Sequence, residues 1–166
     1  MRVEIIPCLQ DNYSYLVIDD INNTAFVIDP SEAEPIINFI EKNNITPLFI
    51  TDNGYPTRLL TCHDAPVLLY YKGRPSLNSN RIVAVVGTRD CTRQGMQATE
   101  EMIAQLAPYG VTIVSGLALG IDSVAHQSAL QNDLTTLAVL PLGLDVIYPA
   151  LNRSLARQLL KAEGGL

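Results

Sequence analysis

The sequence predicts an α/β protein in which a parallel β-sheet is flanked by helices. Residues 82–86 and 111–114 are short runs rich in β-branched residues, each followed by glycine, a hydroxyl residue and a helical pattern. A third run at 135–140 is followed by a further helical pattern. Successive strand–helix units of this kind are typical of a parallel sheet whose turns lie along one edge.

The first forty residues read as three strands and one helix. The strands are rich in β-branched and aromatic residues, and Asn22-Asn23 suits a hairpin turn. Ser31 with Glu34 three residues later is a capping box, which predicts a helix over 31–43. The predicted strands are 3–6, 13–18 and 25–28.

The rest of the chain alternates strands with helices. Before the parallel sheet we expect strands at 48–50 and 67–73, at most two helical turns at 57–61, and a polar linker at 74–80. Apolar periodicity predicts the helices of the sheet, which are 93–107, 121–131 and 151–162.

Composition is typical of a soluble, cytoplasmic protein. The chain has 166 residues, 48% of them hydrophobic. No apolar run approaches the roughly twenty residues that cross a bilayer, so we expect no membrane partner. The start of the chain is too short and too acidic for a secretory signal. Three cysteines without a pattern indicate free thiols rather than a disulfide framework.

Charge is distributed unevenly along the chain, with a net value of −6. Residues 1–40 hold seven acidic side chains and one basic one, whereas residues 41–166 hold ten of each. The net charge therefore does not exclude a polyanion as the ligand of the later part.

The turns after the first two strands of the parallel sheet predict a phosphate site. Glycine lets main-chain N–H groups face a ligand there, beside the positive end of the next helix. In the first turn Arg89 adds a permanently charged fork that grips phosphate oxygens or stacks on a base. The alternatives are a solvated Arg89 and glycines that only permit close packing. The predicted contacts are Gly87, Thr88 and Arg89, then Ser115, Gly116, Ala118 and Gly120.

The loop after the third strand adds further candidates. Tyr148 either stacks on a base or is buried as an anchor of the loop. Arg153 begins a basic stripe that continues at helical spacing, and Asn152 before it is expected to cap the last helix. Asp122 and His126 share a helix face, but the chain lacks the turn motif of a serine hydrolase. We therefore expect Asp122 to cap the helix and His126 to be a packed or capping residue, rather than members of a catalytic triad.

Five motifs between residues 39 and 166 lie at 51–56, 64–73, 86–89, 115–122 and 143–149. In these motifs and in their order, this part of the chain resembles the bacterial DNA-processing protein A family. The resemblance implies an extended Rossmann-like domain that binds single-stranded DNA, forms a dimer and delivers incoming DNA to the strand-exchange recombinase during natural transformation. Compared with the family we expect a truncated domain.

Two segments near the start of the chain, 5–13 and 27–35, form a second pattern. Through them residues 1–35 resemble the start of glyoxalase II, the hydroxyacylglutathione hydrolases of metallo-β-lactamase fold. That family needs a cluster of histidines and aspartate to hold two metal ions. The chain has only two histidines, so we expect no hydrolase activity, no metal and no cofactor.

Together these patterns predict a non-enzymatic, single-stranded-DNA-binding protein. Its expected parts are a β-rich βββα segment at 1–38, connecting strands at 39–80 and the truncated Rossmann-like domain at 81–166. Two alternatives stay open. One is an engineered or recombinant chimera, a de novo protein without retained activity. The other is a Rossmann-like enzyme that binds nucleotides or cleaves nucleoside monophosphates.

Overall fold

Three parallel strands, β6 (Ile82–Ala84), β7 (Thr112–Ser115) and β8 (Thr136–Ala138), form the sheet that positions the candidate site. β7 lies in the middle, and the register brings the carboxyl ends of all three strands to one edge. The predicted parallel sheet is confirmed. β6 and β8 are shorter than expected, because the runs of apolar residues continue into the exposed positions Val86 and Val139.

The protein is described here by a computed structural model, which covers residues 2–8, 12–19, 24–28, 34, 38, 42, 44–141, 143, 144 and 147–166. Within these residues no helix is both long enough and apolar enough to cross a membrane.

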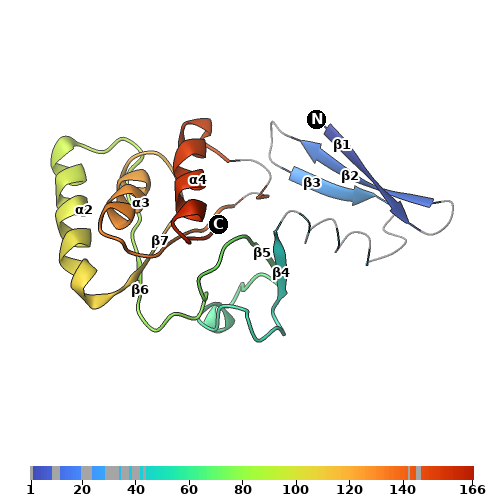
Figure 1. Ribbon diagram of the computed structural model, residues 1–166, viewed down its shortest axis with the longest axis horizontal. Coiled ribbons are helices and arrows are strands. Elements are labelled where there is room, and N and C mark those ends of the chain that lie inside the picture. Colours follow the sequence, from blue (N-terminus) through green and yellow to red (C-terminus); the bar gives the residue numbers. More distant parts are fainter. Residues whose placement is uncertain are drawn as a thin grey trace.

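Three helices accompany the sheet: α2 (Arg93–Leu106), α3 (Ile121–Gln131) and α4 (Arg153–Lys161). α3 packs between α2 and α4 (Figure 1). The predicted bounds of α3 are confirmed. α2 ends just before a 3₁₀ turn, η2 (Ala107–Tyr109), and α4 is preceded by another, η3 (Ala150–Asn152), so both helices are slightly shorter than predicted. The predicted turns at 57–61 reduce to one 3₁₀ turn, η1 (Leu59–Thr61).

Two apolar clusters hold the helices to the sheet. In the first, Ile103 of α2 and Ala125 of α3 pack with Ile113 of β7. In the second, Leu155 and Leu159 of α4 pack near the end of β8. Burying one large aliphatic side chain stabilises the fold by about 1.5–3 kcal/mol, so these clusters fix the edge where the turns lie.

A second sheet joins the first through the last residues described. It consists of the antiparallel pair β4 (Thr46–Phe49) and β5 (Leu68–Tyr71). Gly165 pairs in parallel with Leu137 and antiparallel with Gly73, so residues 164–166 lie between β8 and the end of β5. A Cβ on Gly73 would lie 2.6 Å from the Cα of Gly165, so this contact needs glycine. This pairing was not predicted from the sequence.

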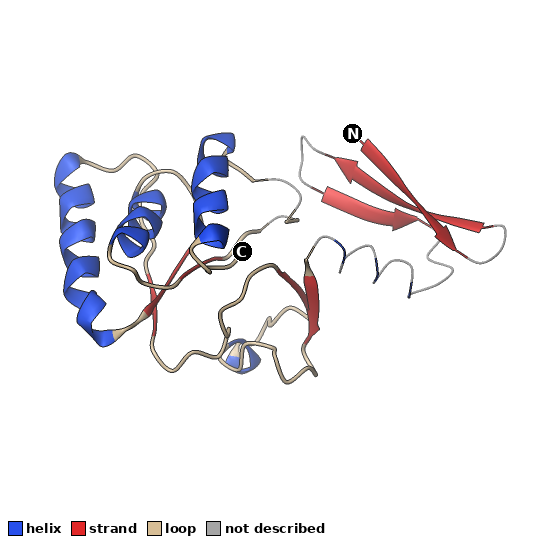
Figure 2. Ribbon diagram, in the orientation of Figure 1, coloured by secondary structure: helices blue, strands red, loops and turns tan. Residues whose placement is uncertain are grey.

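The first part of the chain contains an antiparallel sheet of β1 (Arg2–Cys8), β2 (Asn12–Asp19) and β3 (Thr24–Ile28) (Figure 2). The three predicted strands are confirmed. Most of the helix predicted at 31–43 lies outside the described residues. The three positions of this range that are described, Glu34, Asn38 and Lys42, are helical.

Candidate nucleic-acid interface

The turn between β6 and α2, residues 87–92, is the most open of the predicted sites, and we call it the first turn. Gly87, Thr88 and Arg89 are all exposed. Their main-chain N–H groups donate to no acceptor among the described residues, and the Arg89 side chain makes no ion pair or hydrogen bond there. Thr88 accepts a hydrogen bond at Oγ1 from the N–H of Asp90 (3.2 Å). The first turn therefore offers main-chain donors and a guanidinium to an anion.

The first turn rests on the start of α3. The N–H of Ile121 donates to the carbonyl oxygen of Thr88 (3.1 Å). A Cβ on Gly87 would lie 2.7 Å from side-chain atoms of Ile121, so only glycine fits. Gly120 has a φ of +77°, and a Cβ there would lie 2.1 Å from the Thr88 carbonyl oxygen. The prediction that the two turns lie side by side is confirmed.

The turn between β7 and α3, residues 116–120, is different, and we call it the second turn. The N–H groups of Gly116 and Ala118 donate to Oδ2 of Asp122, at 3.1 and 3.4 Å. Just before the turn, the Ser115 hydroxyl is buried and donates to the carbonyl oxygen of Val85 (2.7 Å). Three of the groups expected to meet phosphate therefore already have partners within the protein.

Asp122 does not cap α3, so that prediction is wrong. Gly120 is the N-cap residue, and Asp122 is the second residue of the helix. Its buried carboxylate instead accepts hydrogen bonds from the N–H groups of the second turn, which would otherwise face a phosphate. Spacing along the helix indicated only a cap at Asp122, because it does not reveal that the side chain reaches back to the loop.

We expect Asp122→Ala to lower the free energy of unfolding by about 1–3 kcal/mol, because two partly buried N–H groups lose their acceptor. Urea unfolding followed by circular dichroism measures the change. Asp64→Ala, at an exposed carboxylate, is the control and should have little effect. Equal stability of the two variants would contradict this role of Asp122.

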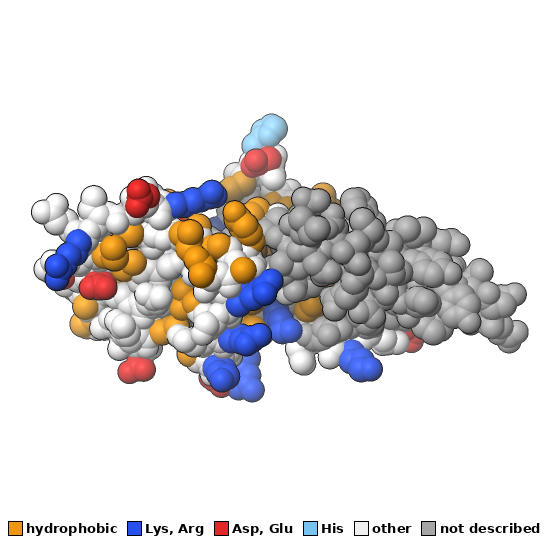
Figure 3. All heavy atoms as spheres, turned by 90° about the horizontal axis from the view of Figure 1, so that it is seen from above, with side chains coloured by type: hydrophobic (Ala, Val, Ile, Leu, Met, Phe, Trp, Pro, Cys, Tyr) orange, Lys and Arg blue, Asp and Glu red, His pale blue; other side chains and the backbone are white. Residues whose placement is uncertain are grey.

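The loop before α4 contributes exposed groups at the same edge. Tyr148 is 63% exposed, so the alternative that it is a buried anchor is wrong. Arg153, the first residue of α4, is also exposed. Figure 3 looks onto this edge and shows apolar side chains in the middle of the described part, with both Lys or Arg and Asp or Glu side chains around them. Among the exposed apolar residues at the strand ends and turns are Val86, Leu119, Val139 and Leu151.

His126 is fully buried under the second turn, as expected for a packed histidine. Thr136 donates its hydroxyl proton to the carbonyl oxygen of Ile113 (3.1 Å), so its oxygen accepts from Nδ1 of His126 (2.7 Å). Nε2 has no hydrogen-bond partner among the described residues. Burial lowers the pKa of His126 from 6.5 to about 4, against the smaller raising effects of the Asp122 carboxylate and the Ser115 main chain. His126 is therefore neutral near pH 7.

This pKa predicts acid sensitivity. Between pH 6.5 and about 4 the unfolded chain binds a proton at His126 that the folded chain does not, so stability falls as the pH falls through this window. The loss attributable to His126 is about 3 kcal/mol. Urea unfolding at several pH values should show a smaller loss for His126→Gln than for the wild type. His63→Gln, at an exposed site, should retain the wild-type loss. If His126→Gln and the wild type lost the same stability as the pH falls, the low pKa would not belong to His126.

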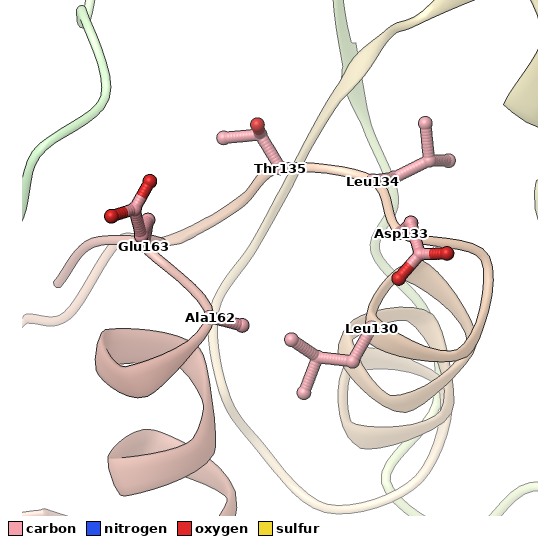
Figure 4. A pocket seen from close by; sticks show the side chains of 6 residues that line it. All are labelled: Leu130, Asp133, Leu134, Thr135, Ala162 and Glu163. Atoms are coloured by element: carbon pink, nitrogen blue, oxygen red, sulfur yellow. The ribbon is translucent and has the colours of Figure 1, made fainter.

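A cavity of about 280 Å³ lies at the opposite edge of the sheet, away from these turns. It is formed where α3 and α4 end, and Leu130 and Ala162 point toward each other across it (Figure 4). Its rim carries carboxylates, at Asp133 and Glu163, which do not suit a phosphate ligand.

The sequence and the architecture are similar to those of known proteins. Residues 46–166 match the model of the family described as DNA recombination-mediator protein A. The chain belongs to this family. The resemblance stated for residues 39–166 is thereby confirmed over residues 46–166.

Individual members of the DNA recombination-mediator protein A family agree with this assignment. The DNA processing protein DprA of Streptococcus pneumoniae is 50% identical over 106 residues, which cover 64% of this chain and 37% of the relative. The X-ray structure of DprA from that species superposes with a TM-score of 0.65 at 38% identity, over 78% of this chain and 46% of the other. The chain thus spans well under half of the length of this curated relative.

A second solved structure concerns DNA. It is described as giving structural insights into the single-stranded DNA binding mode of DNA processing protein A from Helicobacter pylori. The TM-score is 0.59 at 32% identity, over 73% of this chain and 53% of the other.

A different relative matches a shorter segment. The hydroxyacylglutathione hydrolase of Pelagibacter ubique is 60% identical over 55 residues, which cover 33% of this chain and 23% of the relative.

Proposed function

We propose that this chain binds single-stranded DNA without catalysing a reaction, and that the first turn holds the phosphates. The observation that carries the proposal is a set of main-chain donors, at Gly87, Thr88 and Arg89, and a guanidinium that have no partner within the part of the chain that the structure describes. The DNA-binding relative from Helicobacter pylori supports the choice of ligand.

The surroundings of the first turn suit a flexible strand with exposed bases. Tyr148 and the apolar residues at this edge offer surfaces on which bases stack with little sequence preference. Arg153 adds a second positive charge for the backbone. In this proposal the second turn contributes through Gly120, which supports the first turn, rather than through Ser115, Gly116 and Ala118.

Cleavage of nucleoside monophosphates is less well supported. That chemistry needs a free carboxylate in a turn, and Asp122 is engaged by Gly116 and Ala118. Asp145, the other carboxylate considered from the sequence, lies outside the described residues.

A fluorescence titration tests the proposed function. Labelled oligothymidylate should bind, and its affinity should fall steeply between about 50 and 200 mM salt as counterions return to the phosphates. In parallel, nucleoside monophosphates incubated with the protein should release no free base. Lack of oligothymidylate binding even at the lower salt concentration would sink the proposal.

We propose that the biological setting is natural transformation in the cytoplasm, where the protein would pass DNA to the strand-exchange recombinase as a homodimer. Family membership over residues 46–166 supports this setting. Size-exclusion chromatography with mass detection tests the dimer, and a monomer at all concentrations would contradict it.

For residues 1–35 we propose descent from a hydroxyacylglutathione hydrolase of metallo-β-lactamase fold. The 55-residue match to such an enzyme supports this origin. In this proposal the chain is an engineered or recombinant chimera. Its first part, residues 1–38, has lost the hydrolase activity, and its second part consists of connecting strands at 39–80 and the Rossmann-like domain at 81–166. A thioester-hydrolysis assay with added zinc tests the last point, and turnover would contradict it.

A further inference from the structure

The buried side chain of Asn152 ties the loop before α4 to the second turn. Its Nδ2 lies 2.7 Å from the carbonyl oxygen of Leu117, 3.1 Å from that of Ala118 and 2.8 Å from Oγ of Ser123. Asn152 occupies the N-cap position of α4, but its side chain makes no capping hydrogen bond, contrary to the expectation from the sequence. The amide is used for a long-range contact instead.

The segment that Asn152 holds has an unusual conformation. Leu117 is fully buried and has a φ of +56°. This is the left-handed region of the main chain, which residues other than glycine rarely adopt. Such a conformation persists only where the surroundings hold it. The Ser123 hydroxyl also donates to the Ala118 carbonyl oxygen (2.6 Å), and Asp122 accepts from the N–H groups of the same turn. The second turn is therefore held between an amide on its carbonyl side and a carboxylate on its N–H side.

The second turn in turn determines where the first turn lies. The main-chain atoms of Thr88 and Arg89 come so close to Gly120 that a Cβ there would lie 2.1 Å and 2.6 Å from their carbonyl oxygens. The N–H of Ile121 donates to the Thr88 oxygen. A shift of residues 117–120 therefore moves the main chain that carries Arg89.

We propose that Asn152 is a positioning residue of the DNA interface. By fixing the second turn it fixes the place of Thr88 and Arg89. Because Asn152 lies between Tyr148 and Arg153, the same contact holds all three loops of the edge as one unit. This inference rests on the proposed function for its effect on DNA, whereas its structural part can be tested without DNA.

Amide hydrogen exchange of the free protein tests the structural part. Asn152→Leu keeps the approximate volume and removes the donors. We expect exchange at Ile121 and Ala118 to become about tenfold faster, while the core amide of Ile113 keeps its rate relative to global unfolding. The matched control is Asn78→Leu, since Asn78 donates to the Tyr55 carbonyl oxygen and accepts from the Thr57 N–H in another loop. It should leave Ile121 and Ala118 unchanged. Unchanged exchange at Ile121 in Asn152→Leu would overturn the proposal.

A binding cycle tests the effect on DNA. Asn152→Leu should weaken oligothymidylate binding about tenfold, and Asn78→Leu less than about twofold. In an Arg89→Ala background the further loss from Asn152→Leu should be clearly smaller than in the wild-type background, because part of the effect of Asn152 passes through Arg89. Independent, additive losses would overturn the proposal.

If the wild type binds no DNA, the proposed function fails, and the exchange result alone decides the positioning role. If Asn152→Leu does not fold, Ser123→Ala provides the same test, since its hydroxyl belongs to the same network.

Discussion

Gly120→Ala is expected to lower the free energy of unfolding by more than about 4 kcal/mol, the range of severe core substitutions. Two costs add. Alanine is unfavourable at the φ of +77°, and its Cβ would lie 2.1 Å from the Thr88 carbonyl oxygen and 2.6 Å from that of Arg89. These neighbours are main-chain atoms, which cannot rotate away as the end of a side chain can. Urea unfolding followed by far-ultraviolet circular dichroism measures the loss.

Gly110→Ala separates the two costs. Gly110 also has a left-handed conformation, with a φ of +58°, but nothing lies within 4 Å of its added Cβ. This variant should lose only the conformational part, about 1–2 kcal/mol. Equal losses at Gly110 and Gly120 would show that the two turns are not in close contact.

Arg89→Ala is expected to weaken oligothymidylate binding at least about tenfold and to reduce the slope of log affinity against log salt by about one. Arg89 is exposed and unpaired among the described residues, so its loss should affect the folded structure little. The measurement is a pair of titrations at low and moderate salt.

Arg74→Ala is the control of equal charge. Arg74 is also exposed, but it forms an ion pair with Glu163 at the opposite edge of the sheet. Removing it changes the net charge as much as Arg89→Ala does, without touching the first turn. Should both variants lose the same affinity and slope, the general charge of the protein, rather than the first turn, would account for binding.

Local pattern predicted the elements of the α/β part well. The helix at 121–131 and the one beginning at 93 follow from apolar periodicity, which the burial of one helix face imposes. The ends of β6 and β8 were placed too late. Val86 and Val139 have the residue type of a strand but are exposed, although the N–H of Val139 still donates to the carbonyl oxygen of Ser115 (2.9 Å). The strand-like pairing of residues 164–166 had no local signal, since Gly-Gly-Leu is selected by close contacts with distant segments.

The candidate site was predicted in part. Glycines and Arg89 after a β-rich run led to the first turn, whose exposed donors agree with that reading. The partners of Asp122 and Asn152 were not foreseen. Both residue types are frequent helix caps, and sequence alone does not distinguish a cap from a side chain that turns back to a distant loop. A hydrophobic residue at 117 gave no indication of its left-handed conformation either.

The central claim is that DNA phosphates meet the first turn while Asp122 keeps the second turn occupied. The most direct measurement is a two-dimensional NMR titration of the amide signals with an oligothymidylate of about twelve nucleotides. The signals of Gly87, Thr88 and Arg89 should shift most, and those of Gly116 and Ala118 should shift far less. Large shifts confined to Gly116 and Ala118, with the first turn unmoved, would contradict the account.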